Sequence, residues 1–491
     1  MSDPRRKLSQ QFQSAAQRVK YFGNVLTRIE VRGVRCHART LVEIVNPITV
    51  LSGLNGCGKS TLLQLAATAF SCSTSLAISQ FIRKSRFDDP PIGNGSSVSF
   101  QIQQDRTTKQ TLTLNYNSET RRWSGYQRRP NRNVFFAGVG FFLPRSERQD
   151  FVFLDGDTID VQSSAEISES NRSWATRILA SRYDRVLAHQ VVKGRQRETI
   201  LQVQRNDVNY SETQMGCGEA RVHYLICQLE ALPEKSLIML EEPENSLHPS
   251  AQYALGTYLL DLVDRKGHQV LMTTHSEMLM RSLPQDSLVY LHKSNSGIEA
   301  IPGLTSVQAQ SLLSEGYEKA LTVFVEDEAA ELVLTELLGY HNAQLLKTID
   351  IQIHGFNDQE GNVYESGKDS IRRTMKVLRS TGLRVAAVLD ADDSADVDNF
   401  VFKLPGTQPP EKELMQSDAV RIHIEQQYRM DRHQLMQELH GVDCHRYFKI
   451  IGEKTSRHPD LLIAEAARVY ASTIPSSDAA ILISQLTEAT H

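Results

Sequence analysis

The stretch Ile48-Thr-Val-Leu-Ser-Gly53-Leu-Asn-Gly56-Cys-Gly58-Lys59-Ser60-Thr61 decides the fold, because an apolar β-branched run leads into a glycine-rich turn and then a helical pattern. The segment is a P-loop, in which the glycines let successive backbone N–H groups turn inward around a β-phosphate. Lys59 is expected to reach the β- and γ-phosphate oxygens, and the Ser60 hydroxyl to ligate Mg²⁺. We expect the following helix, from Ser60 to about Phe70, to point its positive end at the phosphates. The predicted nucleotide contacts here are Asn55, Gly56, Gly58, Lys59, Ser60 and Thr61.

Length and composition bound the remaining possibilities. The chain has 491 residues and a formal net charge of −4. At about 150 residues per domain, this length predicts two or three domains. The charge excludes a uniformly basic nucleic-acid coat, so contacts with DNA or RNA must come from local patches. The polar start of the chain and the lack of a long apolar run predict a cytoplasmic protein without a membrane partner.

The cysteines predict free thiols, because they show no CxxC spacing and two of them lie inside nucleotide motifs. This pattern fits a reducing compartment better than disulfides or a zinc site. The six are Cys36, Cys57, Cys72, Cys217, Cys227 and Cys444.

Alternating patterns around the P-loop predict a small antiparallel sheet. Residues 25–31 and 40–45 read as strands, and residues 97–103 and 111–116 read as a hairpin. A basic cluster with two interleaved aromatic residues follows the hairpin. It has two readings: a grip on a phosphate backbone with base stacking, or a solvated basic edge that blocks strand aggregation. Its members are Arg121, Arg122, Trp123, Tyr126, Arg128, Arg129 and Arg132.

Three further motifs follow in order after a polar, helix-prone segment at 155–210, which we interpret as a helical arm. The run from Ser211 to Glu219 opens an apolar helix and resembles the ABC signature, in which small residues and a helix N-terminus face the γ-phosphate of a partner subunit's ATP. This resemblance makes Gly216, Gly218 and Glu219 candidate nucleotide contacts. A buried strand then ends in Glu241, which would hold the Mg²⁺ shell, and Glu242, the predicted general base. A later strand ends in His275, whose neutral imidazole can hydrogen-bond a γ-phosphate and sense its presence.

These motifs in this order resemble the ABC-type ATPases of the OLD, Rad50 and SMC group. Glu241-Glu-Pro-Glu-Asn followed by Leu247-His-Pro looks particularly like the OLD branch. The resemblance covers roughly residues 20–300 and implies an antiparallel β subdomain and a helical insertion. It also implies that each ATP is capped by the signature segment of a partner subunit, Gly216 to Glu219, so at least a homodimer is expected. Glu241 stands where most P-loop proteins have Asp.

The second half predicts a separate α/β unit with acids at one sheet edge. The strand Leu321–Val325 ends at Glu326, and the strand Arg384–Leu389 ends at Asp390, followed by Asp392. Neighbouring parallel strands bring such side chains together at their carboxyl ends. Converging carboxylates repel unless a divalent cation neutralises them, and all-oxygen ligands favour Mg²⁺ or Mn²⁺.

This pattern resembles the Toprim fold of topoisomerases, primases and OLD-family nucleases. The resemblance implies that Glu326 is the acid–base glutamate and that Glu326, Asp390 and Asp392 bind metal. It departs from the family at Asp327, where Gly is usual, and at Ala330, where a second acid is usual. Glu425 and Lys454 are later candidates for a two-metal site. The dispersed histidines are interpreted as surface or core residues: His423, His433, His440, His445 and His458.

The expected architecture is α/β: an ABC-type ATPase at 1–305, a linker helix at 306–320, and a Toprim-like domain with C-terminal helices at 321–491. The first hypothesis, implied by the OLD resemblance, is an ATPase that controls a metal-dependent DNA endonuclease in anti-phage defence. The second is a regulatory ATPase whose Toprim-like part is a docking domain for a separate effector protein. The sequence leaves open DNA or RNA as substrate, the trigger, and whether ATP hydrolysis activates or represses cleavage.

Overall fold

The computed structural model describes residues 3–72, 76–83, 86–87, 91–142, 159–294, 297–314, 319–357, 363–365, 367–380 and 383–490. The chain forms two compact units, Met1–Ala309 and Gln310–His491. The division falls in the segment that the sequence predicts as a linker, where α10 spans Ser306–Leu313. Residues 315–318 of that segment lie outside the described ranges. In the described parts of the chain, no helix is long and apolar enough to cross a membrane.

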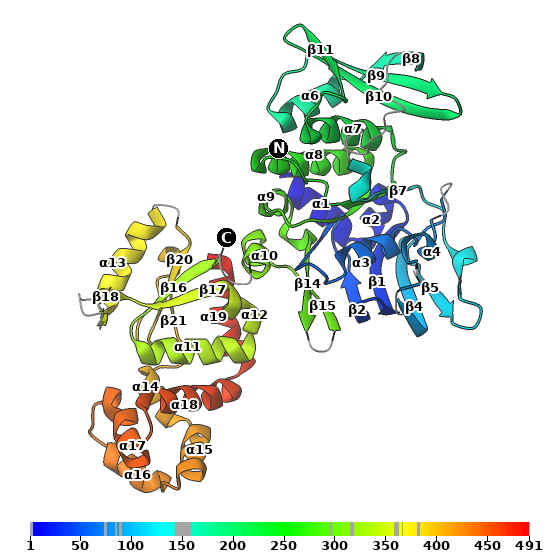
Figure 1. Cartoon of the computed structure of the whole chain (residues 1–491). Helices are drawn as coiled ribbons and strands as arrows, with labels where there is room; N and C mark the ends of the chain where they lie inside the picture. Colours follow the sequence, from blue (N-terminus) through cyan, green and yellow to red (C-terminus); the bar gives the residue numbers. More distant parts are fainter. Residues whose placement is uncertain are drawn as a thin grey trace. The chain divides into compact units, whose positions relative to one another are not determined.

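A six-stranded mixed sheet forms the centre of the first unit (Figure 1). Its four inner strands β14, β3, β13 and β12 are mutually parallel, and β7 adds a further parallel strand at one edge. Every residue of β3 and of β13 is buried, as expected for parallel strands covered on both faces. In spatial order the strands are β15 (Gly297–Pro302), β14 (Leu288–Ser294), β3 (Ile48–Ser52), β13 (Gln269–Thr273), β12 (Leu237–Glu241) and β7 (Val134–Ala137).

Helices cover this sheet. The P-loop helix α3 (Lys59–Ala66) packs on β12 and β13, and α8 (Pro249–Lys266) contacts α1 and α9. The prediction that the P-loop helix reaches about Phe70 is wrong. After Ala66, Thr68 turns its hydroxyl back onto the carbonyl oxygen of Leu65 and its own carbonyl oxygen accepts from Arg129, so the helical ladder stops. The other helices of this unit are α1 (Pro4–Gln13), α2 (Ala15–Phe22), α4 (Ile78–Phe81), α6 (Glu169–Leu179), α7 (Cys217–Ala231) and α9 (Glu277–Ser282).

The antiparallel sheet next to the P-loop is present, with the order β2-β1-β4-β5-β6. Its apolar residues alternate inward, as the sequence pattern predicts. The strands are β1 (Val25–Val34), β2 (His37–Glu43), β4 (Ile92–Gln103), β5 (Lys109–Asn117) and β6 (Arg122–Ser124).

The structure divides the basic cluster that follows β5. Arg132 is 8% exposed and donates to the carbonyl oxygens of Lys235 and Phe22 and to Gln269. Arg129 donates to three backbone carbonyl oxygens and stacks on Tyr126. Arg132 is therefore part of the interior and the half-buried Arg129 is held by the backbone, so a phosphate grip by all five arginines is wrong. The members left exposed are Arg121, Arg122 and Arg128.

The predicted helical arm at 155–210 is also wrong. Residues 155–158 lie outside the described ranges, and the rest forms a four-stranded antiparallel sheet with one helix, α6, beside α7 (Figure 1). Val186 pairs with Val203 across the sheet, and both are buried against Ala220 of α7. The alternation of buried and exposed residues that marks these strands is short and lies among Arg, Gln and Ser residues, so the sequence did not indicate strands here. The strands are β8 (Asp160–Glu166), β9 (Arg185–Lys193), β10 (Gln196–Arg205) and β11 (Val208–Ser211).

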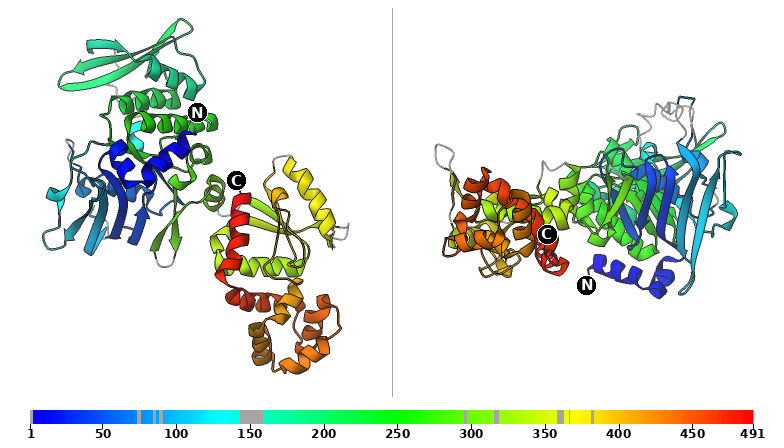
Figure 2. Two further views of the ribbon diagram at one scale, coloured as in Figure 1. Left: turned by 180° about the vertical axis from the view of Figure 1, so that it is seen from behind. Right: turned by 90° about the horizontal axis from the view of Figure 1, so that it is seen from below.

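The second unit is built on a parallel sheet of order β17-β16-β20-β21. Alternate residues point to opposite faces: Val323 and Val388 join the core beneath α11 (Glu328–His341) and α18 (Pro459–Thr473), whereas Leu389 joins the core beneath α13 (Gly367–Ser380). Figures 1 and 2 show the strands between α13 and α19 (Ser476–Ala489). The strands are β16 (Leu321–Val325), β17 (Ile349–Ile353), β20 (Val385–Leu389) and β21 (Val401–Lys403), with a separate pair β18 (Gly355–Asn357) and β19 (Val363–Glu365).

Helices make up most of the second unit after β21, as the sequence predicts. α14 and α18 contact α11, which joins this helical part to the sheet. The helices are α11 (Glu328–His341), α12 (Ala343–Thr348), α13 (Gly367–Ser380), α14 (Pro410–Gln416), α15 (Asp418–Tyr428), α16 (Arg432–Leu439), α17 (Tyr447–Thr455), α18 (Pro459–Thr473) and α19 (Ser476–Ala489).

Candidate functional site

The P-loop has a backbone that requires glycine at two positions. Gly53 has φ 141° and Gly58 has φ 85°, a region that favours glycine. A side chain at Gly53 would also clash sterically, because its Cβ would lie 2.5 Å from the Leu291 carbonyl oxygen. A Cβ at Gly58 would lie 2.2 Å from Nε2 of His37, a buried residue of β2. The antiparallel sheet therefore supports the loop directly.

The predicted phosphate contacts lie at the tip of this loop and at the start of α3. Asn55 and Gly56 are exposed, and Ser60 is half-buried in the first turn. The Thr61 hydroxyl accepts from the Arg35 guanidinium at 3.0 Å, so Thr61 already has a structural partner.

Lys59 is buried and turned onto its own loop. Its Nζ donates to the carbonyl oxygens of Gly53 at 2.7 Å and Leu54 at 3.1 Å. Burial lowers the pKa of Lys59 below its ordinary value, while the charges of Cys57 and Glu242 oppose that shift. An ammonium group held only by neutral carbonyl oxygens is suited to exchange them for phosphate oxygens.

Glu241 and Glu242 end the strand β12, as predicted. Glu242 has φ 47°, unusual for a residue other than glycine, and its N–H donates to the Thr273 carbonyl oxygen at 3.1 Å. The Asn245 side chain donates to Glu242 Oε2 at 2.8 Å. A strained backbone held by its neighbours is common at functional sites. These contacts fix the Glu242 carboxylate in one orientation.

His275 lies between the P-loop and Glu242, because β13 is the strand between β3 and β12. Its Nε2 is 3.5 Å from Glu242 Oε1. Partial burial and the charge of Lys59 lower the pKa of His275, with Glu242 opposing, so the imidazole is neutral at pH 7. The structure thus brings Lys59, Glu242 and His275 together from three elements.

Glu244 is a residue of this site that the sequence analysis did not single out. It is 4% exposed, and its Oε1 accepts from the Thr274 hydroxyl and from the His275 N–H, the latter at 3.2 Å. Burial raises the pKa of Glu244. Its carboxyl group therefore holds the turn on which His275 sits. The sequence did contain a signal for Glu244, which is the third acidic residue of the segment Glu241-Glu-Pro-Glu.

The signature segment splits into residues with different surroundings. A Cβ at Gly216, the residue before α7, would meet nothing within 4 Å, whereas one at Gly218 would lie 2.5 Å from the Ser246 carbonyl oxygen. Glu219 accepts from the hydroxyls of Tyr183 at 2.8 Å and Tyr210 at 2.7 Å. Gly218 and Glu219 thus have structural roles, whereas the space around Gly216 is free for a ligand.

A hollow of about 420 Å³ lies beside this segment. Gly218 and Glu219 line one side of it, and His248 and Ser250 at the start of α8 line another. The signature end of α7 is therefore accessible within the first unit.

In the second unit, Glu326 and Asp390 meet at the carboxyl ends of two neighbouring strands, as predicted. Glu326 Oε1 accepts from the Asp390 N–H at 3.1 Å. Asp390 is 9% exposed, and burial together with the charges of Asp327, Glu326, Glu411 and Asp392 raises its pKa to about 8. Burial and the neighbouring acids raise the pKa of Glu326 as well.

The other predicted metal ligands are placed differently. Asp392 is exposed, whereas Asp393 turns toward α13 and pairs with Lys368 at 3.2 Å and Arg372 at 2.9 Å. The later candidates lie in other ion pairs. Glu425 pairs with Arg432 at 3.8 Å, and Lys454 pairs with Glu438.

Two residues near Asp390 were not expected there. Glu411 begins α14 after the Pro-rich loop and is 5% exposed, and His445 Nδ1 lies 3.1 Å from its Oε1. His445 is exposed, as the interpretation of a surface residue expects, but it lies within 4.8 Å of carboxylate oxygens of Asp327 and Glu411, a proximity that the sequence spacing did not indicate.

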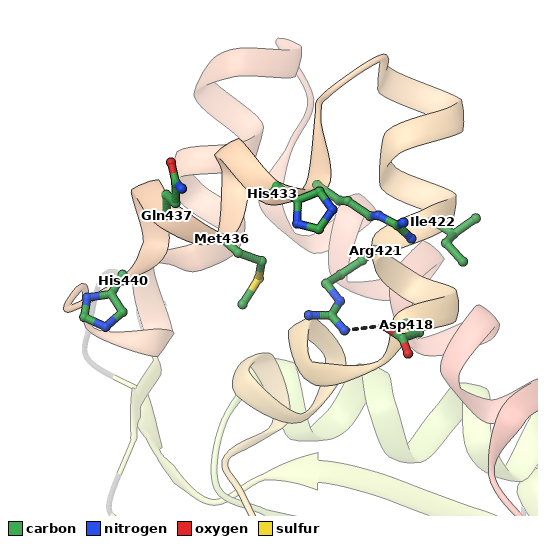
Figure 3. A pocket seen from close by; sticks show the side chains of 8 residues that line it. Asp418, Arg421, Ile422, His433, Met436, Gln437 and His440 are labelled. Atoms are coloured by element: carbon green, nitrogen blue, oxygen red, sulfur yellow. Dashed lines mark hydrogen bonds and ion pairs between the residues drawn. The ribbon is translucent and has the colours of Figure 1, made fainter.

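A larger hollow of about 870 Å³ lies between α15 and α16 (Figure 3). Its cations are neutralised nearby: Arg421 pairs with Asp418, and Arg432 with Glu425. His433, Met436 and His440 complete a mixed lining that indicates no ligand class.

The Asp390 pKa predicts how the stability of the second unit depends on pH. The pKa is about 8 in the folded protein and about 3.9 in an unfolded chain. The folded state therefore holds the proton more tightly, and stability falls as pH rises from about 4 to about 8. We expect Asp390→Asn to weaken this dependence and to stabilise the unit at pH 8. Hydrogen exchange of the β16 and β20 amides, measured in EDTA, checks this. Equal pH dependence in both proteins would contradict it.

Comparison with known proteins gives partial matches. Residues 48–281 match the family described as "AAA domain, putative AbiEii toxin, Type IV TA system". A stretch of 88 residues, 18% of this chain, is 32% identical to Protein ea59 of Escherichia phage lambda. That match spans 17% of the length of the phage protein.

Solved SMC heads also resemble the fold, with low TM-scores. The SMC head domain from Thermotoga maritima has a TM-score of 0.35 at 14% identity, over 56% of this chain and 98% of that one. A Pyrococcus furiosus Smc head with an extended coiled coil, bound to the C-terminal domain of ScpA, has a TM-score of 0.38 at 11% identity, over 60% and 99%. The family match and the site's own residues indicate a P-loop ATPase domain at residues 48–281, for which ATP and Mg²⁺ are the expected ligands.

Proposed function

We propose that the chain binds and hydrolyses ATP, and that ATP joins two copies of it through their first units. The observation that carries the proposal is the meeting of Lys59, Glu242 and His275 at the ends of α3, β12 and β13. Three groups with different roles in phosphoryl transfer, a cation, a carboxylate base and a neutral imidazole, come together next to a P-loop.

Each residue of the site would have a separate role in ATP hydrolysis. Lys59 would leave its two carbonyl partners for the phosphate oxygens, and Ser60 and Glu241 would hold Mg²⁺, which supplies neutralisation of phosphate charge. Glu242 would orient the attacking water and take its proton. His275 lies 3.5 Å from Glu242. In its neutral form the imidazole carries one N–H group, which would donate a hydrogen bond to the γ-phosphate.

The signature segment supports dimerisation. Gly216 precedes α7 with no neighbour near its Cβ position, so an approaching phosphate would meet the N-terminal end of a helix. Within one copy, Gly218 and Glu219 are already engaged in packing and hydrogen bonds. A γ-phosphate held by the second copy is the ligand that fits this open end.

Three variants separate ATP binding from dimerisation. We expect Glu242→Gln to form a stable dimer with ATP, because the nucleotide binds and is not hydrolysed. Lys59→Met should lose ATP binding and the dimer together. Gly216→Glu fits the open space and φ of −61°, and should bind ATP yet stay monomeric, because its charge repels the phosphate. Sedimentation velocity with fluorescent ATP measures both properties. Dimerisation of Gly216→Glu with ATP would contradict the proposed interface.

A second candidate activity is metal-dependent cleavage of DNA by the second unit. The observation that favours it is the contact of Glu326 with Asp390 at one sheet edge, where burial and neighbouring like charges raise both pKa values. Such an edge accepts divalent cations. The competing function is a regulatory ATPase, in which this unit docks a separate effector protein.

Plasmid nicking decides between these functions. We expect purified protein to nick supercoiled plasmid with Mg²⁺ or Mn²⁺, and Asp390→Ala to lose this activity. Asp398→Asn, at an exposed acid of the same unit, is the matched control. Glu242→Gln then gives the sign of ATP control. No nicking by any protein, with ATP hydrolysis intact, would support the regulatory ATPase instead.

A further inference from the structure

Three elements of the second unit meet beside the acidic sheet edge. Asp327 caps the N-terminus of α11, Glu411 lies in the first turn of α14, and His445 lies in the short 3₁₀ helix Cys444–Arg446. Of these elements, α14 contacts both α11 and the 3₁₀ helix. One ligand atom from each of the three residues lies within 4.8 Å of the others.

Glu411 is the residue that points to a ligand. It is 5% exposed, and its Oε1 faces His445 Nδ1 at 3.1 Å. Its Oε2 is buried and has no hydrogen-bond partner among the described residues. A buried carboxylate oxygen without a partner costs folding free energy, so a positively charged ligand at this place would stabilise the protein.

The charge around Glu411 supports a cation. Asp327 and Asp390 are close enough for their charges to act on each other, and Glu411 adds to the repulsion at Asp390. Asp390 Oδ1 is likewise buried without a hydrogen-bond partner in the described parts of the chain. His445 is the residue that faces Glu411, and it is exposed to solvent. Even a protonated imidazole would balance this group of acids incompletely.

We propose that Asp327, Glu411 and His445 form a binding site for a divalent transition-metal ion of the Mn²⁺ and Zn²⁺ class. The donor set decides the class: two carboxylates suit any hard divalent ion, and the imidazole favours transition metals over Mg²⁺ and Ca²⁺. This ligand set differs from the predicted Glu326, Asp390 and Asp392, because it includes a histidine and residues from the C-terminal helices. The proposal depends on neither ATP hydrolysis nor DNA cleavage.

The alternative is a plain ion pair, in which protonated His445 neutralises Glu411. Partial burial lowers the pKa of His445, but the charges of Glu411, Asp443 and Asp327 outweigh it and raise the pKa above its ordinary value. An ion pair needs the proton on the imidazole, whereas a metal site needs it displaced. Nitrogen coordination to the metal therefore distinguishes the two.

Mn²⁺ bound to the full-length, nucleotide-free chain provides the test. We expect a bound Mn²⁺ whose pulsed EPR spectrum shows coupling to a ¹⁴N nucleus, and we expect His445→Gln to lose that coupling. Glu411→Gln and Asp327→Asn should each weaken Mn²⁺ binding by more than about tenfold. Removal of a residue that only hydrogen-bonds a metal ligand already costs about tenfold in affinity, and loss of a ligand itself should cost more. Zn²⁺ should displace the Mn²⁺, and Mg²⁺ in about hundredfold excess should not.

The variants preserve the fold for identifiable reasons. Asparagine at 327 can keep the cap, since the Ala330 N–H donates to Asp327 Oδ1 at 2.8 Å. His458→Gln is the matched control, because His458 also pairs with a carboxylate, Asp460 at 2.9 Å, on the same helical part. ¹⁴N coupling that persists in His445→Gln, or Mn²⁺ affinity unchanged in both carboxylate variants, would overturn the proposal. Absence of plasmid nicking with this coupling present would count against the nuclease alone.

Discussion

The nucleotide site depends on the parallel pairing of three buried strands, in which β13 lies between β3 and β12. This order brings the P-loop, the paired acids and His275 to one sheet edge, because parallel strands present their carboxyl ends together. The apolar side chains of these strands fix the register, since a slip of one residue would turn each side chain to the opposite face. The buried Glu244 then holds the backbone of His275 in place. The chemistry therefore follows from packing in the strands below it.

The second unit uses the same principle with a different outcome. Its parallel strands bring Glu326 and Asp390 together, and helices packed later in the chain add Glu411 and His445. Desolvation disfavours each carboxylate charge, and the neighbouring acids increase that cost. The folded chain thus keeps a group of acids that is stable when protonated or bound to a cation. Such an arrangement lowers stability in the empty state, which is typical of binding sites rather than of structural ion pairs.

The sequence predicted the parts of the site whose signals are local. An apolar strand followed by a glycine-rich turn placed Lys59. The ends of later apolar runs placed the candidate residues Glu242, His275, Glu326 and Asp390. The insertion was mistaken for helices, because its buried valines alternate over short strands among polar residues. Glu411 and His445 follow a Pro-rich loop and a helical stretch, and only tertiary packing brings them to Asp327. The sequence also could not tell that Asp393, and not Asp392, contacts α13, because that contact depends on where the fold places Arg372.

The most direct test of the ATPase account is phosphate release by His275→Gln, measured beside ATP affinity. In the proposed mechanism His275 lies at the γ-phosphate, 3.5 Å from the proposed base, so the substitution should act on the transition state more than on binding. We expect phosphate release to fall by about a hundredfold or more, with ATP affinity changed less than about threefold. Unchanged phosphate release would contradict this role for His275, and so would equal losses of affinity and rate.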